Sequence, residues 1–261
     1  MPATSCTDSR SPPRAWRLWL KSLRLAGHIL AGFAILAAMP IRRRRAGRMA
    51  GWWYRRLLRI MGITVEVRGP TPAPGTLVVA NHVSWLDIIV FGGLLDAAFV
   101  SKSEVGDWPV IGRFARLTGT IFLPRGAGET REASNRIGAA LAADRCVMLF
   151  PEATTRADLL PSRFHARLFA AAIDGGHTLQ PAALHYPRGD ARPGHHPDAP
   201  WVGAASLAPH FMTLFGRHGM RARVTFCPPI PVTGRDRRAL AEQSHAAIAA
   251  ALEASAEPDA D

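Results

Sequence analysis

Short apolar runs bounded by glycine, proline or charged residues recur from residue 64 to residue 226. Their branched and aromatic side chains favour extended backbone, so each run predicts a strand. The predicted strands are residues 64–68, 76–80, 97–101, 120–123, 146–150, 179–186 and 222–226. Apolar residues with helical spacing lie between them, most clearly at 129–143, 163–174 and 237–254. This alternation predicts an α/β fold with a mostly parallel sheet flanked by helices on both faces.

A different pattern occupies the N-terminal segment. Residues 25–41 are an almost uncharged apolar run of about 17 residues, which is the short limit for a helix that spans a membrane. Residues 48–61 alternate apolar and arginine positions in helical period, as in a helix that lies among lipid headgroups. We predict a helical hairpin that dips into one leaflet. The alternatives are two core helices of a soluble domain, or a cleaved signal peptide, for which a small-residue cleavage site is missing.

The chain of 261 residues, 48% of them hydrophobic, can bury one sizeable core. We therefore divide it into a basic, apolar membrane-anchoring helical segment (1–62), an α/β domain (63–254) and a polar tail (255–261). The cysteines Cys146 and Cys227 lie within apolar strand-like runs and indicate a reduced compartment. His195 and His196 lie in a loop rich in proline and glycine, without ligands at metal-binding spacing, so we predict a surface loop there and no metal site.

The positive charge is confined to the N-terminal segment. The formal net charge is +12, and no acid occurs between Asp8 and Glu66, where 13 arginine and lysine residues lie. Residues 66–261 carry equal numbers of basic and acidic side chains. A nucleic-acid-binding protein more often spreads its cations over a folded face, whereas these cations flank apolar stretches. We expect anionic membrane lipids as partners and no nucleic acid.

Residues 81–87, with the sequence Asn-His-Val-Ser-Trp-Leu-Asp, follow directly after a predicted strand and carry the clearest chemistry. A neutral imidazole takes a proton from a hydroxyl when a carboxylate holds its other ring nitrogen. The spacing between His82 and Asp87 allows this arrangement. In the alternative interpretation, His82 caps a helix that begins near Trp85 and Asp87 is an ordinary first-turn acid.

Three later runs follow in order: residues 119–125 (GTIFLPR), 150–155 (FPEATT) and 179–186 (LQPAALHY). Together with residues 81–87 they resemble the four sequence blocks of the glycerolipid acyltransferases, whose bacterial members include 1-acyl-sn-glycerol-3-phosphate acyltransferase. The resemblance covers roughly residues 60–232. One position departs from it, because the family usually has glycine where this chain has Ala153. We expect the added methyl group to narrow the space beside a bound phosphate.

The resemblance implies transfer of a fatty acyl group from an acyl thioester to the free hydroxyl of 1-acyl-glycerol-3-phosphate, which gives phosphatidic acid. His82 is then the expected general base, and Asp87 is expected to hold its imidazole. Arg125 is expected to pair with the acceptor phosphate, because a guanidinium group matches such oxygens. An ordinary surface arginine is the alternative. A Ser84 nucleophile, or a soluble hydrolase, is disfavoured because no glycine-flanked elbow surrounds this serine.

Four further residues complete the expected substrate site. Glu152 is expected to orient the acceptor or to brace the arginine of the second block, although a helix N-cap is the alternative. Thr154 and Thr155 are expected to donate hydrogen bonds to the same anion. Pro181 is expected to shape a wall of the donor site.

Residues 201–203 (WVG) and 209–211 (PHF) resemble a stretch of bacterial family members that include the lyso-ornithine lipid acyltransferases. In those relatives an acid commonly follows the WVG triplet, whereas this chain has Ala204. O-acylation of lyso-ornithine lipid or another lysolipid is therefore the alternative function. A basic peripheral lipid-binding protein is the non-enzymatic alternative, although such a protein needs neither His82 nor Asp87.

The expected reaction needs no cofactor. An acyl-CoA or acyl-carrier-protein thioester serves as co-substrate, and a protein of charge +12 attracts either anionic carrier. A lysolipid acceptor completes the expected partners. We expect the enzyme at the membrane, with its catalytic domain on the cytoplasmic face.

Overall fold

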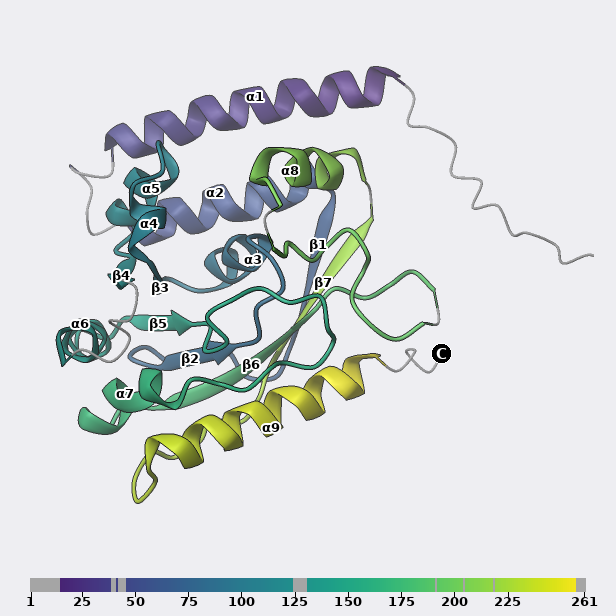
Figure 1. Cartoon of the computed structure of the whole chain (residues 1–261). Helices are drawn as coiled ribbons and strands as arrows, with labels where there is room; N and C mark the ends of the chain where they lie inside the picture. Colours follow the sequence, from purple (N-terminus) through teal and green to yellow (C-terminus); the bar gives the residue numbers. More distant parts are fainter. Residues whose placement is uncertain are drawn as a thin grey trace, which may run out of the picture.

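A seven-stranded sheet in the order β1-β7-β6-β2-β5-β3-β4 forms the centre of the protein (Figure 1). The computed structural model describes residues 15–38, 41, 46–123, 131–190, 192–203, 205–217 and 219–256. The strands are β1 (Ile63–Arg68), β2 (Leu77–Ala80), β3 (Ala97–Lys102), β4 (Ile121–Leu123), β5 (Cys146–Leu149), β6 (Leu179–His185) and β7 (Met220–Phe226). All seven predicted strands are confirmed, with ends that differ by one or two residues.

The sheet is mostly parallel, as predicted. Strands β6 and β7 are its antiparallel pair, and the other neighbouring strands run parallel. All residues of β2, β5 and β6 are buried, because helices cover both faces of the sheet. The carboxyl ends of the parallel strands therefore meet along one edge, where sheets of this kind carry their sites.

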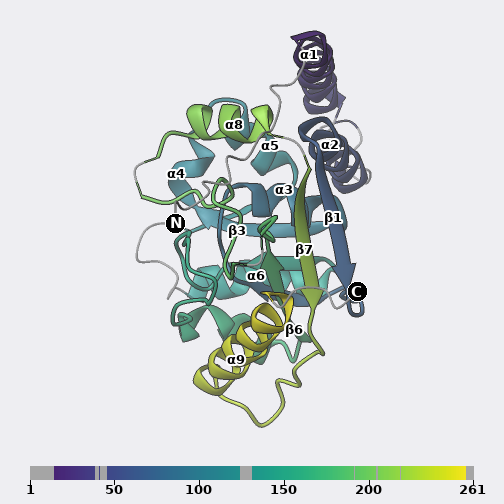
Figure 2. The ribbon, with the colours of Figure 1, turned by 90° about the vertical axis from the view of Figure 1, so that its right-hand side faces the viewer.

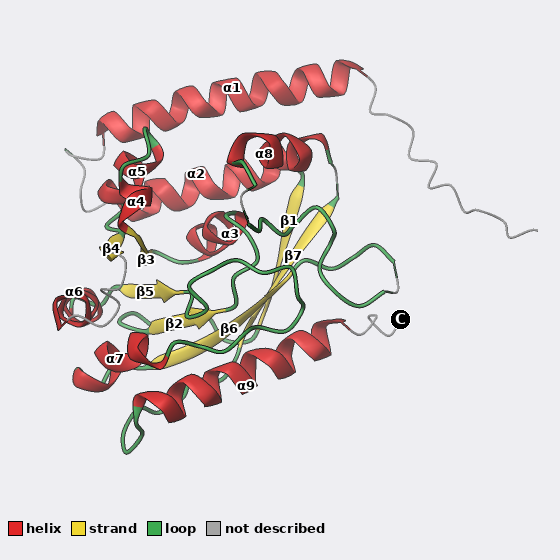
Figure 3. Ribbon diagram, in the orientation of Figure 1, coloured by secondary structure: helices red, strands yellow, loops and turns green. Residues whose placement is uncertain are grey.

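The helices form two layers, one on each face of the sheet (Figures 1 and 3). The helices are α1 (Ala15–Ala38), α2 (Ala46–Met61), α3 (Leu86–Leu94), α4 (Ser103–Gly106), α5 (Ile111–Leu117), α6 (Arg131–Ala142), the 3₁₀ helix η3 (Ala166–Phe169), α7 (Ala170–Asp174), α8 (Leu207–Gly216) and α9 (Arg237–Ala256). One buried core joins α2, α3 and α8 to the sheet. A second core, on the opposite face, joins α6, α7 and α9 to it.

The prediction of one continuous helix over residues 163–174 is wrong. Residues 163–165 have no regular secondary structure, a 3₁₀ turn follows, and α7 contains five residues. Two tertiary contacts hold the start of this segment in a non-helical conformation. The His165 amide donates to Pro151 O at 3.0 Å, and the buried Phe164 ring meets His245 of α9 edge-on, with centroids 5.2 Å apart. Tertiary contacts here override local helix propensity.

The N-terminal helices form the predicted hairpin, but its second helix is part of the protein core. The apolar face of α2 packs against α3 and buries Tyr54, Leu57, Leu58 and Met61. Lys21 of α1 is not a lipid-facing cation. Its ammonium group is buried and donates to the carbonyl groups of Met61, Phe215 and Arg217, at the ends of α2 and α8. Cations are favourable at helix C-termini, so Lys21 fastens α1 to the domain.

Helix α1 lies outermost, above α2 and on the side opposite to α9 (Figures 1 and 2). Residues Trp16–Ala38 are long and apolar enough to cross a membrane. The outward face of α1 exposes large apolar side chains: Trp16, Trp19, Leu20, Leu23, Ile29, Leu30 and Phe33. An apolar face of this extent on a soluble surface is unusual and marks an interaction site, which makes α1 the candidate for membrane association.

Candidate active site

The loop between β2 and α3 carries the predicted catalytic pair. His82 lies just after the end of β2, and Asp87 lies in the first turn of α3. His82 Nδ1 donates to Asp87 Oδ2 at 2.8 Å. The predicted pairing is therefore present in the structure. Asp87 also holds the loop before the helix, since the same oxygen accepts the amides of Val83 and Ser84 at 2.7 and 3.0 Å.

Asp87 is completely buried and its second oxygen is also engaged. The Tyr186 hydroxyl donates to Asp87 Oδ1 at 2.8 Å. Burial and then the neighbouring Asp87 charge raise the pKa of Tyr186 well above its usual value, so this hydroxyl keeps its proton and remains a donor. Four donors thus hold the carboxylate in one orientation and stabilise its charge.

This arrangement prepares the imidazole to accept a proton. Because Nδ1 of His82 donates to Asp87, Nε2 is the ring nitrogen that carries the free lone pair. The ring stacks on Phe150, with centroids 4.1 Å apart and planes 15° apart. Its side chain is 18% exposed, whereas that of Asp87 is 0% exposed. The buried carboxylate and the stacked ring therefore leave one reactive nitrogen at the surface of the site.

Glu152 supports the catalytic loop from the end of β5. Its Oε1 accepts the His82 amide at 3.0 Å. Its Oε2 accepts the amide and hydroxyl of Ser162 at 2.8 and 2.9 Å. The alternative of a helix N-cap is wrong, because residues 151–165 contain no helix. A role of Glu152 toward the acceptor stays a prediction, as does bracing of Arg125, which lies outside the described residues.

Residues 199–203 and 205–211 pack against the catalytic loop. The Trp201 amide donates to Val83 O at 3.0 Å, and the Trp85 indole donates to His210 Nδ1 at 2.9 Å. The Thr155 hydroxyl donates a hydrogen bond to the Trp201 carbonyl oxygen. The two short sequences that resembled the lyso-ornithine group, residues 201–203 and 209–211, are thus packed directly against the loop that carries His82.

Two polar residues of the first block are structural. Asn81 binds the Leu184 backbone in both directions, at 2.9 and 2.8 Å, and joins the end of β2 to β6. Ser84 is completely buried, and its hydroxyl has no hydrogen-bond partner within the described part of the chain. A nucleophile must reach the substrate, so the burial of Ser84 argues against the nucleophile alternative.

The remaining predicted site residues have different surroundings. Thr154 is exposed, whereas Pro181 is buried within β6, where it pairs with Val79 of β2. Their contacts with substrate stay predictions. Ala153 is exposed and has a left-handed backbone, with φ of 57°. Glycine adopts this conformation without strain, which explains the glycine expected at this position.

Sequence reasoning missed Tyr186 and His195. Tyr186 ended the fourth block but received no role, and the surface-loop prediction for His195 is wrong. His195 is 4% exposed and its Nδ1 accepts the Tyr186 amide at 3.3 Å. Burial, followed by the charge of His185, lowers the pKa of His195 to about 4, so this ring is neutral at neutral pH. The residue supports Tyr186 and thereby the Asp87 carboxylate.

Known proteins share both sequence and fold with this chain. The model of a family described as Acyltransferase matches residues 63–185. The lyso-ornithine lipid O-acyltransferase of Pseudomonas aeruginosa is 36% identical, over 93% of this chain and 96% of that protein. The 1-acyl-sn-glycerol-3-phosphate acyltransferase of Neisseria meningitidis serogroup B is 38% identical, over 51% of this chain and 53% of that protein. The crystal structure of the 1-acyl-sn-glycerophosphate acyltransferase PlsC from Thermotoga maritima covers 95% of this chain, with a TM-score of 0.67 and 18% identity, and so shares its fold.

Proposed function

Because this chain belongs to the acyltransferase family, we propose that it moves a fatty acyl group from an acyl thioester to the free hydroxyl of a lyso-ornithine lipid. The enzyme class, an O-acyltransferase of lysolipids, is the one that the sequence predicted. The observation that carries the chemistry is the hydrogen bond between His82 Nδ1 and Asp87 Oδ2.

In the proposed reaction, His82 Nε2 removes the hydroxyl proton as the acceptor oxygen attacks the thioester carbonyl carbon. The new C–O bond forms first, and the C–S bond then breaks. The imidazolium ion returns its proton to the departing sulfur. Asp87 stays ionised throughout and stabilises the transient positive charge on the ring.

Two observations favour the lyso-ornithine acceptor. The Pseudomonas aeruginosa relative matches nearly the whole chain, and a second lyso-ornithine lipid O-acyltransferase, from Rhodobacter capsulatus, matches 89% of it at 32% identity. In addition, Trp201 and His210 contact the catalytic loop through Val83 and Trp85. We propose that this segment, from its position beside the catalytic loop, helps select the acceptor headgroup that reaches His82.

Lysophosphatidic acid, the acceptor first expected from the sequence, is the second candidate. The Neisseria meningitidis relative supports it, although that similarity covers 51% of this chain. The four sequence blocks are common to both acceptor classes and do not separate them. We further propose that the acyl donor is a coenzyme A or carrier-protein thioester and that the catalytic domain faces the cytoplasm.

The test is a competition assay with the purified full-length protein, a labelled acyl thioester, and equal amounts of lyso-ornithine lipid and lysophosphatidic acid. We expect the labelled product to be mainly the ornithine lipid. A preference for lysophosphatidic acid would replace the first acceptor with the second. Absence of either product with a folded protein would refute the proposed function.

A further inference from the structure

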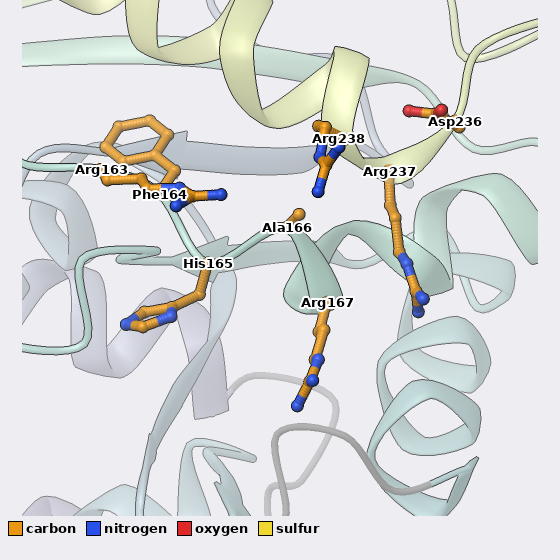
Figure 4. A pocket seen from close by; sticks show the side chains of 8 residues that line it. All are labelled: Arg163, Phe164, His165, Ala166, Arg167, Asp236, Arg237 and Arg238. Atoms are coloured by element: carbon orange, nitrogen blue, oxygen red, sulfur yellow. The ribbon is translucent and has the colours of Figure 1, made fainter.

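A cavity of about 700 Å³ lies between the segment that leads into η3 and the first turn of α9. Four arginines line it: Arg163, Arg167, Arg237 and Arg238. Figure 4 shows Arg163 reaching toward Arg238, whereas Arg167 and Arg237 point away from that pair, toward the bottom of the view. A neighbouring cavity of about 420 Å³ shares Arg167 and Arg237 and adds Arg131.

Among the described residues that line this cavity, arginines outnumber acids. Among its lining residues the one acid is Asp236. Its carboxylate Oδ1 accepts the Ala239 amide at 2.8 Å and so caps the start of α9. None of the described acids lies within ion-pair distance of Arg163, Arg237 or Arg238. Arg163, Arg237 and Arg238 thus bring guanidinium groups without a described acidic partner to one space, which suits an anion with several oxygens.

The position of two of these arginines is unfavourable for helix stability. Arg237 and Arg238 occupy the first turn of α9, a helix of 20 residues. The positive end of the helix dipole lies there and destabilises cations. An anion in the cavity removes this repulsion, because it interacts favourably with both the helix N-terminus and the guanidinium groups.

The cavity is connected to the catalytic loop and turned away from the membrane-facing helix. Glu152 joins the His82 amide to Ser162, and the next residue, Arg163, lines the cavity. Helix α9 lies on the opposite side of the sheet from α1, the helix with the exposed apolar face (Figures 1 and 2). An anion that binds here comes from water, not from the lipid surface.

We infer that this arginine cavity, named for Arg163, Arg167, Arg237 and Arg238, binds the phosphate groups of the acyl thioester donor. The inference rests on the proposed function, in which the donor is a water-soluble thioester. The shared chemistry is the phosphate at the end of a pantetheine arm, whether that arm belongs to coenzyme A or to a carrier protein. The acceptor lipid, by contrast, approaches from the α1 side.

The first test measures binding without catalysis. Free coenzyme A is titrated calorimetrically into the full-length protein and into the double variant Arg237→Gln/Arg238→Gln. We expect binding at least tenfold weaker in the variant and substantial recovery with Arg237→Lys/Arg238→Lys. Arg221→Gln, which removes an exposed arginine of β7, is the control and should bind like the wild type. Equal binding by the wild type and the glutamine variant would overturn the inference.

The second test uses donors that differ in phosphate. The Michaelis constant for acyl-CoA or acyl carrier protein should rise at least tenfold in the glutamine variant, whereas that for acyl-pantetheine, which lacks phosphate, should not change. If the Michaelis constant rises for only one of the two phosphorylated donors, that donor is the one whose phosphate the cavity binds. An equal rise for acyl-pantetheine would refute phosphate recognition. Suppose that the glutamine variant loses coenzyme A binding but the wild type acylates none of the lysolipids. That result would support phosphate binding in the cavity and refute the proposed function.

Discussion

The buried Tyr186 hydroxyl donates a hydrogen bond to Asp87 Oδ1, while His82 Nδ1 donates one to Oδ2 of the same carboxylate. The tyrosine therefore holds Asp87 from the side opposite to the base. A carboxylate that is free to rotate would release the imidazole, so Tyr186 contributes to the orientation of His82 without touching the substrate. This contact joins the end of β6 to the first turn of α3.

Tyr186→Phe removes one donor from this buried carboxylate. We expect the free energy of unfolding to fall by about 1.5–3 kcal/mol, as for a lost hydrogen bond to a charged group. Turnover should fall about tenfold because the base is less well oriented. Denaturant titration and steady-state kinetics measure the two effects. Tyr54→Phe, the same change at a tyrosine of α2 that makes no hydrogen bond to Asp87, is the control and should leave turnover unchanged.

His82→Ala removes the proposed general base. We expect turnover to fall by at least about 100-fold, and Asp87→Asn to cause similar loss through the wrong tautomer and orientation. Labelled-product assays and thermal unfolding check activity and integrity. Ser84→Ala is the informative companion, because its buried hydroxyl has no partner among the described residues. Near-native activity of Ser84→Ala together with inactivity of His82→Ala is expected, and the reverse result would exclude the base mechanism.

His195 makes stability depend on pH. Its pKa is lowered from 6.5 to about 4 in the folded protein. The unfolded chain therefore binds the proton more readily, and stability is lost as pH falls from about 6.5 to about 4. The shift corresponds to a loss of about 3 kcal/mol. Denaturant titrations across this range should show a shallower decline for His195→Asn. An equally shallow decline for the half-exposed His177→Asn would contradict the assignment to His195.

Ala153→Gly relieves a left-handed alanine with φ of 57°. We expect the free energy of unfolding to rise by up to about 1 kcal/mol, since the strain removed exceeds the entropy that glycine adds to the unfolded chain. Ala157→Gly, in the same loop and without a positive φ, should instead lower it. If the methyl group crowds a bound phosphate, Ala153→Gly also improves use of lysophosphatidic acid. Little change in acceptor preference is expected if the enzyme acts on the lyso-ornithine lipid.

The exposed apolar face of α1 should control membrane binding. Leu23 and Leu30 are 63% and 69% exposed, and glutamate at both positions should release the protein from anionic vesicles in a flotation assay. Charge reversal at residues 42–45, which the structure does not describe, should weaken binding in a salt-dependent way. Ala246→Glu/Ala250→Glu adds the same charge to the exposed side of α9 and should have little effect. Undiminished flotation of Leu23→Glu/Leu30→Glu would exclude this face as the anchor.

Local spacing was sufficient to predict the strands and the central chemistry, but not the helix expected over residues 163–174. All seven strands were predicted because each is a short apolar run with a clear boundary. The His82–Asp87 pair was predicted because its members lie five positions apart, so the backbone of one loop and one helical turn brings them together. Such relationships depend on few dihedral angles and are readable from the chain itself.

The other partners of the site were decided by the tertiary structure. Tyr186 lies 99 positions from Asp87, and they meet because β6 lies beside β2, although three strands come between them in the sequence. His195 and Lys21 have ordinary loop and helix surroundings in the sequence, yet both are buried: His195 against the Tyr186 amide, and Lys21 against carbonyl groups of the distant residues Met61 and Phe215. The arginine cavity likewise needs two segments some 70 residues apart. No local pattern encodes these contacts, because strand order and crossovers determine which segments become neighbours.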